Sequence, residues 1–353
     1  MSDRDAERPG VYALVPAQSV SNDKLLAFAA SVLPETSPER MLQSWWRRAD
    51  PSLAVAALHQ GTRTIAGLCV GRPSTWMIEG NSCPAVAICS WYVAPDHGGR
   101  LIGRRLVRHF EAPDRLMYAY SLSDDAIRYL SRLGWVGPYA SSLYALPLPR
   151  AARMVHALLR RERDVTFAEY EVQAPAMPEP LGADLERIAA VTEHGPYAHM
   201  RRGRDEWAWR LSVCGPRSYW FCVASRSGKP VGYIAARRMT PGSSRILGKR
   251  EGAMITDLVA PENDPGVARA LVAKAVSFAG DLRAFVVLAA TTIPTHDACY
   301  AALGFLSPRF PAIGRRLAGS APQFMWLPRG PGAHLTADRM ALSFSDSDVD
   351  LNL

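Results

Sequence analysis

The sequence lacks the cysteine patterns that bind metals or build a disulfide framework. None of its six cysteines forms a C-x-x-C pair, and no cluster of cysteine and histidine has the spacing of a zinc site. Most of the cysteines stand in apolar runs typical of strands, where a reduced, buried thiol is the usual state. We therefore expect no metal cofactor and a reducing, cytoplasmic compartment.

Long apolar runs are also missing. Residues 1–10 are polar and contain no apolar core of a signal peptide, and no uninterrupted apolar stretch approaches the length of a membrane span. We expect a flexible segment over residues 1–10 and no transmembrane segment.

The excess of positive charge is modest. Lys and Arg number 41 against 33 Asp and Glu, a net charge of +8 over 353 residues, which favours anionic ligands. Aromatic side chains are not interleaved with a long basic stripe, so the pattern argues against nucleic acid as a partner. The length and a hydrophobic content of 48% predict two folded domains.

The most informative stretch runs from Trp91 to Arg108. It has the pattern of a strand, a glycine turn and a basic amphipathic helix. Such a helix start directs unpaired backbone N–H groups and a positive dipole end at one point, which suits a pyrophosphate. Glycines allow a ligand to approach the backbone, and arginines add fixed positive charge. The residues predicted to bind the cofactor are Trp91, Tyr92, Val93, His97, Gly98, Gly99, Arg100, Leu101, Ile102, Gly103 and Arg104.

The predicted order of helices and strands occurs twice. Apolar periodicity and turn residues predict elements at 11–16, 22–32, 38–46, 53–59, 65–71, 85–93, 102–110, 116–122, 123–133 and 141–146. Matching elements are predicted at 184–192, 219–225, 231–237, 253–259, 265–278, 284–290 and 296–303. This repetition indicates one fold used twice.

The repetition sets the expected domain organisation. We expect a flexible N-terminus at 1–10, a cofactor-binding domain at 11–148, a basic linker helix and loop at 149–183, a second, degenerate domain at 184–328 and an acidic C-terminal tail at 329–353. The basic helix at 150–161 is interpreted as a solvated connector, with docking to an anionic surface as the alternative.

This arrangement resembles the GNAT acyltransferase superfamily. The similarity rests on a V-x-P strand, a glycine turn and helices that end in "LGW" or "LGF", at Val93–Pro95, Gly98–Gly103, Leu133–Trp135 and Leu303–Phe305. The chain is most similar to bacterial tandem-GNAT proteins, in which a second, degenerate copy follows the first. Trp209-Arg210 and the acidic tail Ser345–Asp350 fit that group. The resemblance covers about residues 11–148 and 184–328, and it implies an α/β (α+β, mixed-sheet) class with two tandem acyl-CoA N-acyltransferase folds.

The two copies depart from the family motif in different ways. In the first, Gly98 replaces the usual Gln or Arg, and Leu101 replaces a usual glycine. In the second, the turn at 259–266 is shorter and acidic and contains a proline, and acidic groups repel a diphosphate. We infer one cofactor site, in the first copy.

The resemblance implies acyl transfer, acetyl or longer, from acyl-CoA to an amine or hydroxyl of a small molecule or sugar. A backbone N–H near Tyr92 or Val93 would polarise the thioester carbonyl. The first copy has no carboxylate on the strand before V-x-P, and Leu130 occupies the place of the family's tyrosine acid, whereas Tyr300 matches that place in the second copy. The candidate catalytic residues are Tyr129, Tyr300, Asp257 and Ser90.

Several alternatives remain at this stage. Tyr129 and Tyr300 are also interpreted as packing residues, Asp257 as a cap and His97 as a solvent-facing turn residue. At the level of function, the alternatives to an enzyme are a non-catalytic acyl-CoA sensor or scaffold and a FemAB-like aminoacyl transferase.

Overall fold

The protein is described by a computed structural model. It describes residues 11–34, 37–39, 42, 53–98, 101–148, 158, 164–173, 176–192, 197–213, 218–241, 249–307 and 322–346. The predicted flexible N-terminus, the helix at 38–46, Gly99, Arg100, most of the basic helix at 150–161 and the last seven residues therefore lie outside or largely outside the described part.

Within the described part, the first sheet has nine strands, seven of them in the order β1-β2-β3-β4-β5-β14-β6. Along this order the neighbouring strands are antiparallel except for β4 and β5, which are parallel. The strands are β1 (Tyr12–Pro16), β2 (Ala54–His59), β3 (Ile65–Ile78), β4 (Asn81–Val93), β5 (Leu116–Tyr120), β14 (Gln323–Trp326) and β6 (Val136–Ala140). The short strands β9 (Ala198–Met200) and β15 (Met340–Ala341) join this sheet through the distal end of β3.

The second sheet has six strands in the described part, in the order β7-β13-β12-β11-β10-β8. Here β12 and β13 are the parallel pair. The strands are β7 (Ser142–Pro147), β13 (Val286–Thr291), β12 (Gly252–Val259), β11 (Lys229–Met239), β10 (Ser218–Arg226) and β8 (Thr166–Gln173).

Each sheet is covered by helices on both faces, because successive strand residues point to opposite sides. In β2, Ala54 and Ala56 pack toward α1, whereas Val55 and Ala57 pack toward α3 and α4. The second sheet repeats this pattern, with α6 and α7 on one face and α8 and α9 on the other. The helices are α1 (Asn22–Val32), α3 (Ile102–Arg108), α4 (Asp124–Arg132), α6 (Glu179–Thr192), α7 (Arg204–Val213), α8 (Pro265–Asp281) and α9 (Pro294–Ala302). None of the helices that the structure describes combines the length and the apolar character needed to cross a membrane.

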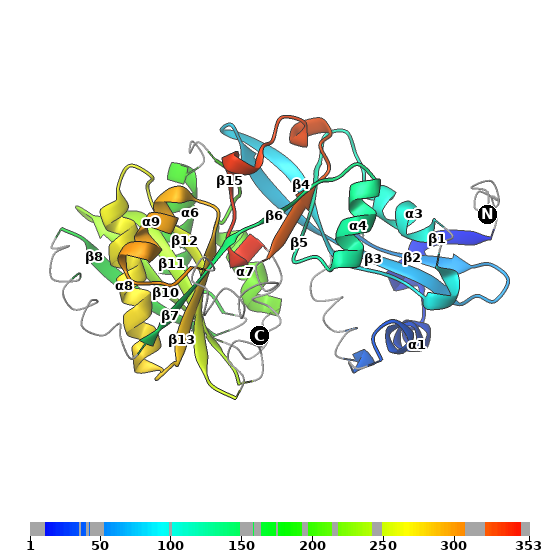
Figure 1. The fold of residues 1–353 in the computed structure, drawn as a ribbon, viewed down its shortest axis with the longest axis horizontal. Helices are drawn as coiled ribbons and strands as arrows, with labels where there is room; N and C mark the ends of the chain where they lie inside the picture. Colours follow the sequence, from blue (N-terminus) through cyan, green and yellow to red (C-terminus); the bar gives the residue numbers. More distant parts are fainter. Residues whose placement is uncertain are drawn as a thin grey trace.

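Two strands are exchanged between the sheets. β7 leaves the first sheet and pairs with β13, from Ser142 opposite Thr291 to Pro147 opposite Val286. In return β14, from near the C-terminus, lies between β5 and β6. Figure 1 shows the two lobes with β7 beside β13 and β14 beside β5. The strand expected at 141–146 exists, but the prediction that it closes the first half is wrong, since it completes the other sheet.

The linker and the tail also differ from expectation. Within 149–183, residues 166–173 form β8, an edge strand of the second sheet paired with β10, so this range is more than a helix and a loop. The acidic tail is packed in its described part, because Asp346 is buried and forms an ion pair with Arg202 at 2.5 Å. The sequence alone does not distinguish an acidic side chain that forms a buried ion pair in the fold from one that is exposed to solvent.

Buried charges join the lobes. Arg72 on β3 donates to Glu206 on α7 at 2.6 Å, and Glu206 also pairs with Arg210 at 2.9 Å. Burial acts to raise the pKa of Glu206, but Arg72 and Arg210 outweigh it and leave that pKa below its ordinary value. The carboxylate therefore stays charged between two cations from different lobes.

Candidate functional site

The first-lobe site is built where β4 loses its parallel neighbour. Pairing of β4 with β5 ends at Ile88 and Ala119. Next to this point Val70 faces Ser90 and Gly71 faces Ile88, so Cys89 is an extra residue, a β-bulge. Bulges often redirect a strand beside a functional site. Residues 90–93 thus continue without β5 and lead into the predicted cofactor turn.

Leu101 adopts an unusual backbone conformation at the end of this turn. It is the N-cap of α3, with φ 55° and ψ 10°, in the left-handed region that favours glycine. The leucine therefore keeps the backbone geometry of a glycine at this position. Beyond it, the first N–H groups of α3 have no partner inside the helix.

The glycines of the turn have different roles. A Cβ on Gly103 would lie 2.9 Å from the Trp91 ring, so packing on Trp91 requires a glycine here. A Cβ on Gly98 would meet only the Pro95 carbonyl oxygen, at 3.3 Å. The sequence predicts that Gly103 lets a ligand approach the backbone. The structure gives a second reason for a glycine here, the packing against Trp91, which the sequence did not reveal.

The side chains around α3 form a small cluster. Trp91 and Tyr129 pack edge to face with their ring centroids 5.1 Å apart. The Tyr129 hydroxyl lies next to Arg104, and burial raises the pKa of Tyr129 above its ordinary value. The Arg104 Nε is buried and has no hydrogen-bond partner among the described residues. Tyr129 therefore supports Trp91 and Arg104 at the start of α3.

Two other predicted residues have structural partners. His97 forms a hydrogen bond of 3.0 Å through Nδ1 with the Tyr12 hydroxyl, so it is held against β1. Ser90 is buried directly after the bulge, opposite Val70. Leu130, at the position of the family's tyrosine acid, is fully buried in the core. The bulge of the first lobe thus carries Ser90, and neither of the two strands that form it contains Asp or Glu.

The second lobe repeats this layout with different side chains. Pairing of β12 with β13 ends at Met254 and Leu288, and Thr256 is the bulge residue, because Ala235 faces Asp257 and Ala236 faces Ile255. The structure therefore places Ser90 and Tyr129 in the first lobe and Asp257 and Tyr300 in the second, and of these only Asp257 and Tyr300 line a common recess.

Asp257 is the centre of a buried polar network. It accepts hydrogen bonds from Tyr233 at 2.5 Å and Ser343 at 2.9 Å, and it pairs with Arg202 at 3.0 Å. Arg202 in turn reaches Asp346. Tyr300 is also buried, which raises its pKa well above the ordinary value. Asp257, Tyr300 and Arg202 line one recess of about 20 Å³, room for a single water molecule.

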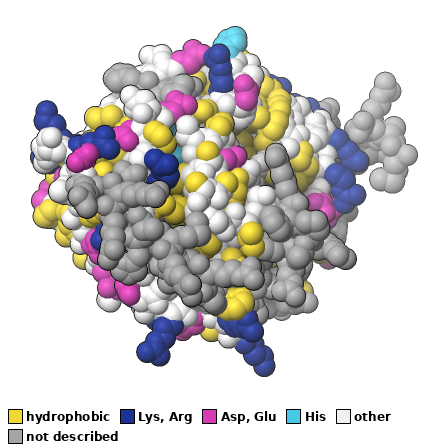
Figure 2. All heavy atoms as spheres, turned by 60° about the vertical axis from the view of Figure 1, so that its left-hand side comes forward, with side chains coloured by type: hydrophobic (Ala, Val, Ile, Leu, Met, Phe, Trp, Pro, Cys, Tyr) yellow, Lys and Arg dark blue, Asp and Glu magenta, His cyan; other side chains and the backbone are white. Residues whose placement is uncertain are grey.

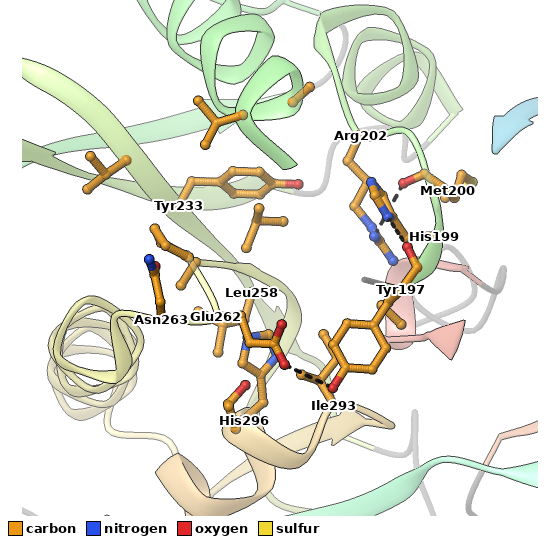
Figure 3. Close-up of a pocket in the computed structure, with 18 residues that line it drawn as sticks. Tyr197, His199, Met200, Arg202, Tyr233, Leu258, Glu262, Asn263, Ile293 and His296 are labelled. Atoms are coloured by element: carbon orange, nitrogen blue, oxygen red, sulfur yellow. Dashed lines mark hydrogen bonds between the residues drawn. The ribbon is translucent and has the colours of Figure 1, made fainter. Parts of the chain in front are cut away.

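A cavity of about 660 Å³ opens in front of this recess. Figure 3 shows it with Tyr233 on one side of the view and Tyr197 on the other. Most of its walls are apolar; they include Val191, Val231, Leu258, Val259, Ile293 and Ala341. Its polar lining includes His199, Arg202, Glu262 and His296. The sequence predicted no such cavity, because its walls come from segments far apart in the chain.

His296 is the residue that the sequence reasoning overlooked. It stands in the first turn of α9 and is 6% exposed. Burial lowers its pKa to about 4, so the imidazole is neutral at pH 7. The only available signal was a histidine five residues after the end of a buried strand, and histidines at such positions are also common in packed helices.

The second lobe differs most at the turn before α8. Asp264 caps α8 by accepting from the Val267 N–H at 3.4 Å, and it pairs with Arg226 at 2.7 Å. A carboxylate therefore occupies the helix start where a diphosphate would bind. This supports the expectation that the second copy does not hold a diphosphate.

On one face of the molecule, the charged side chains of the described residues are mixed in sign. On the face in Figure 2, Lys and Arg side chains of the described residues are spread among acidic ones rather than joined in a stripe. Among the same described residues, no set of three His, Cys, Asp or Glu is grouped as a metal site.

Comparison with known proteins connects the first lobe to a family. Residues 18–135 match the acetyltransferase (GNAT) family. This match covers about a third of the chain, so it shows a similarity of the first lobe to the family. It includes β4, the predicted cofactor turn, α3 and α4. No curated protein sequence matches the chain.

Solved structures extend the GNAT fold to the second half. A GCN5-related N-acetyltransferase from Anabaena variabilis has a TM-score of 0.62 at 13% identity, over 89% of this chain and 72% of that one. A GCN5-related N-acetyltransferase from Kribbella flavida has a TM-score of 0.56 at 17% identity, over 91% of this chain and 72% of that one. A tandem GNAT protein from the clavulanic acid biosynthesis pathway has a TM-score of 0.51 at 15% identity, over 89% of this chain and 97% of that one. The predicted mixed α/β class and tandem GNAT fold are therefore confirmed.

Proposed function

We propose that the protein transfers an acyl group, acetyl or longer, from acyl-CoA to the amine of a small molecule or amino sugar, with a hydroxyl as the less common acceptor. The observation that carries this proposal is the GNAT family match over residues 18–135, since it contains the whole turn from Pro95 to Arg104. In the reaction the amine nitrogen attacks the thioester carbonyl, the C–S bond breaks, and the amine loses a proton as the thiolate leaves.

The proposed diphosphate site is the start of α3. The left-handed Leu101 supports it because it makes no side-chain cap to the first N–H groups of the helix, and Arg104 supplies a buried nitrogen without a described partner. Gly98 leaves the backbone accessible. Trp91, Tyr92, Val93, His97, Gly99, Arg100, Ile102 and Gly103 complete the proposed set.

The proposed pantetheine site is the edge of β4 beyond Ile88, where its pairing with β5 has ended. A pantetheine arm can pair with residues 90–93 as an added strand, because β5 no longer does. The thioester would then lie near Ser90 and the bulge. In this proposal Ser90 binds the water that removes the amine proton, and Tyr129 positions Trp91 and Arg104. Tyr300 and Asp257 would act only on a ligand of the second lobe.

Calorimetry with acetyl-CoA and octanoyl-CoA tests the binding step. We expect one molecule per chain. Gly98→Glu should weaken binding about tenfold or more, because a carboxylate then faces the diphosphate while the backbone tolerates a side chain. The matched control is Asn263→Glu in the second-lobe turn, which should bind like the wild type. Gly103→Glu is unsuitable, since Trp91 fills the space of its Cβ. If neither CoA ester binds, the proposal is wrong.

A second candidate is an acyl-CoA sensor without turnover. The observation that favours it is the first-lobe centre itself, where Leu130, at the place of the family's tyrosine acid, is buried, and where neither β3 nor β4 contains Asp or Glu. Release of free CoA thiol in the presence of a panel of amines and amino sugars separates the two. Amine-dependent release identifies an enzyme, and tight binding with none identifies a sensor.

A further inference from the structure

The second-lobe cavity is separate from the proposed transfer site. β9 borders the cavity and pairs with β3 at Met77, whereas the first-lobe bulge faces β3 at Val70. Seven residues of strand separate these points, about 23 Å at the usual rise per residue. A ligand in this cavity therefore does not reach the thioester proposed for the first lobe.

The cavity also disfavours a second CoA. The start of α8 beside it is capped by Asp264, so its backbone N–H groups and dipole already have a carboxylate. Glu262, on the same turn, adds a further negative charge. A diphosphate would meet two carboxylates here.

Glu262 gives the cavity a preference for positive charge. Its side chain is exposed at the cavity and accepts a hydrogen bond of 3.2 Å from the Tyr197 hydroxyl (Figure 3). No ion pair to Glu262 occurs within the described ranges. A ligand cation can therefore complement this carboxylate without displacing a protein cation.

The remaining residues that line the cavity favour a ligand with an apolar body. The walls are mainly aliphatic, and Val191 at the edge is 61% exposed, an apolar side chain that a ligand would cover. One polar group stands among them. His296 is more than nine-tenths buried, and its ring nitrogens have no hydrogen-bond partner in the part of the chain that the structure describes. A neutral imidazole offers one donor and one acceptor.

From these observations we propose that the second lobe binds a small molecule with an apolar body and a protonated amine. The amine contacts Glu262, the body covers the aliphatic walls, and His296 supplies a second polar contact. This site goes beyond the acyl transfer proposed above and is independent of it.

The test uses probes that share one apolar chain and differ only in the head group. Calorimetry of the full chain is carried out with n-octylamine, 1-octanol and octanoate. We expect n-octylamine to bind tightest, 1-octanol about fivefold more weakly, and octanoate more weakly still. The imidazole NMR signal of His296, assigned by its loss in His296→Phe, should shift on addition of n-octylamine and thereby locate the probe.

Two variants test the contacts. Glu262→Gln should weaken n-octylamine about fivefold and leave 1-octanol unchanged, while the control Glu251→Gln, at the other end of β12, should change neither. Val191→Lys should weaken n-octylamine through like charge. Glu262→Gln and Val191→Lys should both retain the wild-type affinity for acetyl-CoA.

Three results would overturn the proposal. The first is octanoate binding as tightly as n-octylamine. The second is an equal effect of Glu262→Gln and Glu251→Gln. The third is competition between octanoyl-CoA and n-octylamine, which would identify the cavity as an acyl-CoA site.

Discussion

Two residues at the start of α3, Leu101 and Gly103, differ from what an average residue would do at their positions. The left-handed backbone of Leu101 costs about 1–2 kcal/mol of conformational strain. Most non-glycine residues adopt this conformation only where the surrounding fold supports it. Gly103 shows the opposite case, an ordinary helical position where only the Trp91 ring excludes a side chain. A glycine motif can therefore persist, or lose a member, for reasons of packing as well as of ligand binding.

His296 provides a test at this scale through pH. Its pKa is about 4 in the folded protein and 6.5 in the reference state. As pH falls from about 6.5 to 4, the unfolded chain takes up a proton that the folded chain does not, so folding loses stability in this window. His296→Phe should remove that loss. The variant should gain about 1.4 kcal/mol relative to the wild type for each pH unit below about 6.5.

Urea unfolding at pH 7.5, 6.5 and 5.5 measures this difference. His334→Phe, at an exposed histidine, is the matched control and should follow the wild type. Parallel pH dependence of wild type and His296→Phe would show that His296 is not held neutral.

At the scale of elements, the two copies differ at the start of corresponding helices, α3 in the first lobe and α8 in the second. In the first lobe α3 begins at a left-handed leucine without a side-chain cap, and in the second α8 begins at the capping Asp264. Asp264→Ala should lower the free energy of unfolding by about 1 kcal/mol, because an N–H of α8 loses its acceptor. Asp264→Asn should cost less, since an amide oxygen still caps the helix. Chemical denaturation of both variants checks this, and equal losses would assign the effect to the ion pair with Arg226 instead.

Elements with strong local signals could be predicted from the sequence, and their partners could not. The helix at Asn22–Val32 is found as expected from its apolar face, and Ser123 caps α4 through the Ala126 N–H. The turn before α3 was located because V-x-P and glycines lie within one short stretch. By contrast, β6 and β9 are short and carry weak alternation, and nothing local states that β7 pairs with β13. The cavity is likewise invisible in sequence, since it forms only when α6, β9, β12 and α9 meet.

At the scale of the whole molecule, the exchanged strands make each lobe incomplete alone. Without β14, the edges of β5 and β6 would face each other unpaired, and without β13 the strand β7 would have no partner. Buried backbone groups without partners are costly, as is the loss of the Arg72–Glu206 pair across the lobes. The lobes should therefore depend on each other for stability.

This dependence predicts how pieces of the chain behave. Residues 1–148 produced alone should lack a cooperative unfolding transition, because their sheet misses β14 and carries an unpaired β7. A chain cut within residues 149–157 should instead remain a 1:1 complex and unfold in a single transition, since both exchanged strands keep their partners. Size-exclusion chromatography and thermal unfolding followed by circular dichroism distinguish these outcomes. If residues 1–148 unfold cooperatively and bind acetyl-CoA on their own, the exchanged strands are not what holds the first lobe together, and the first lobe is an autonomous unit.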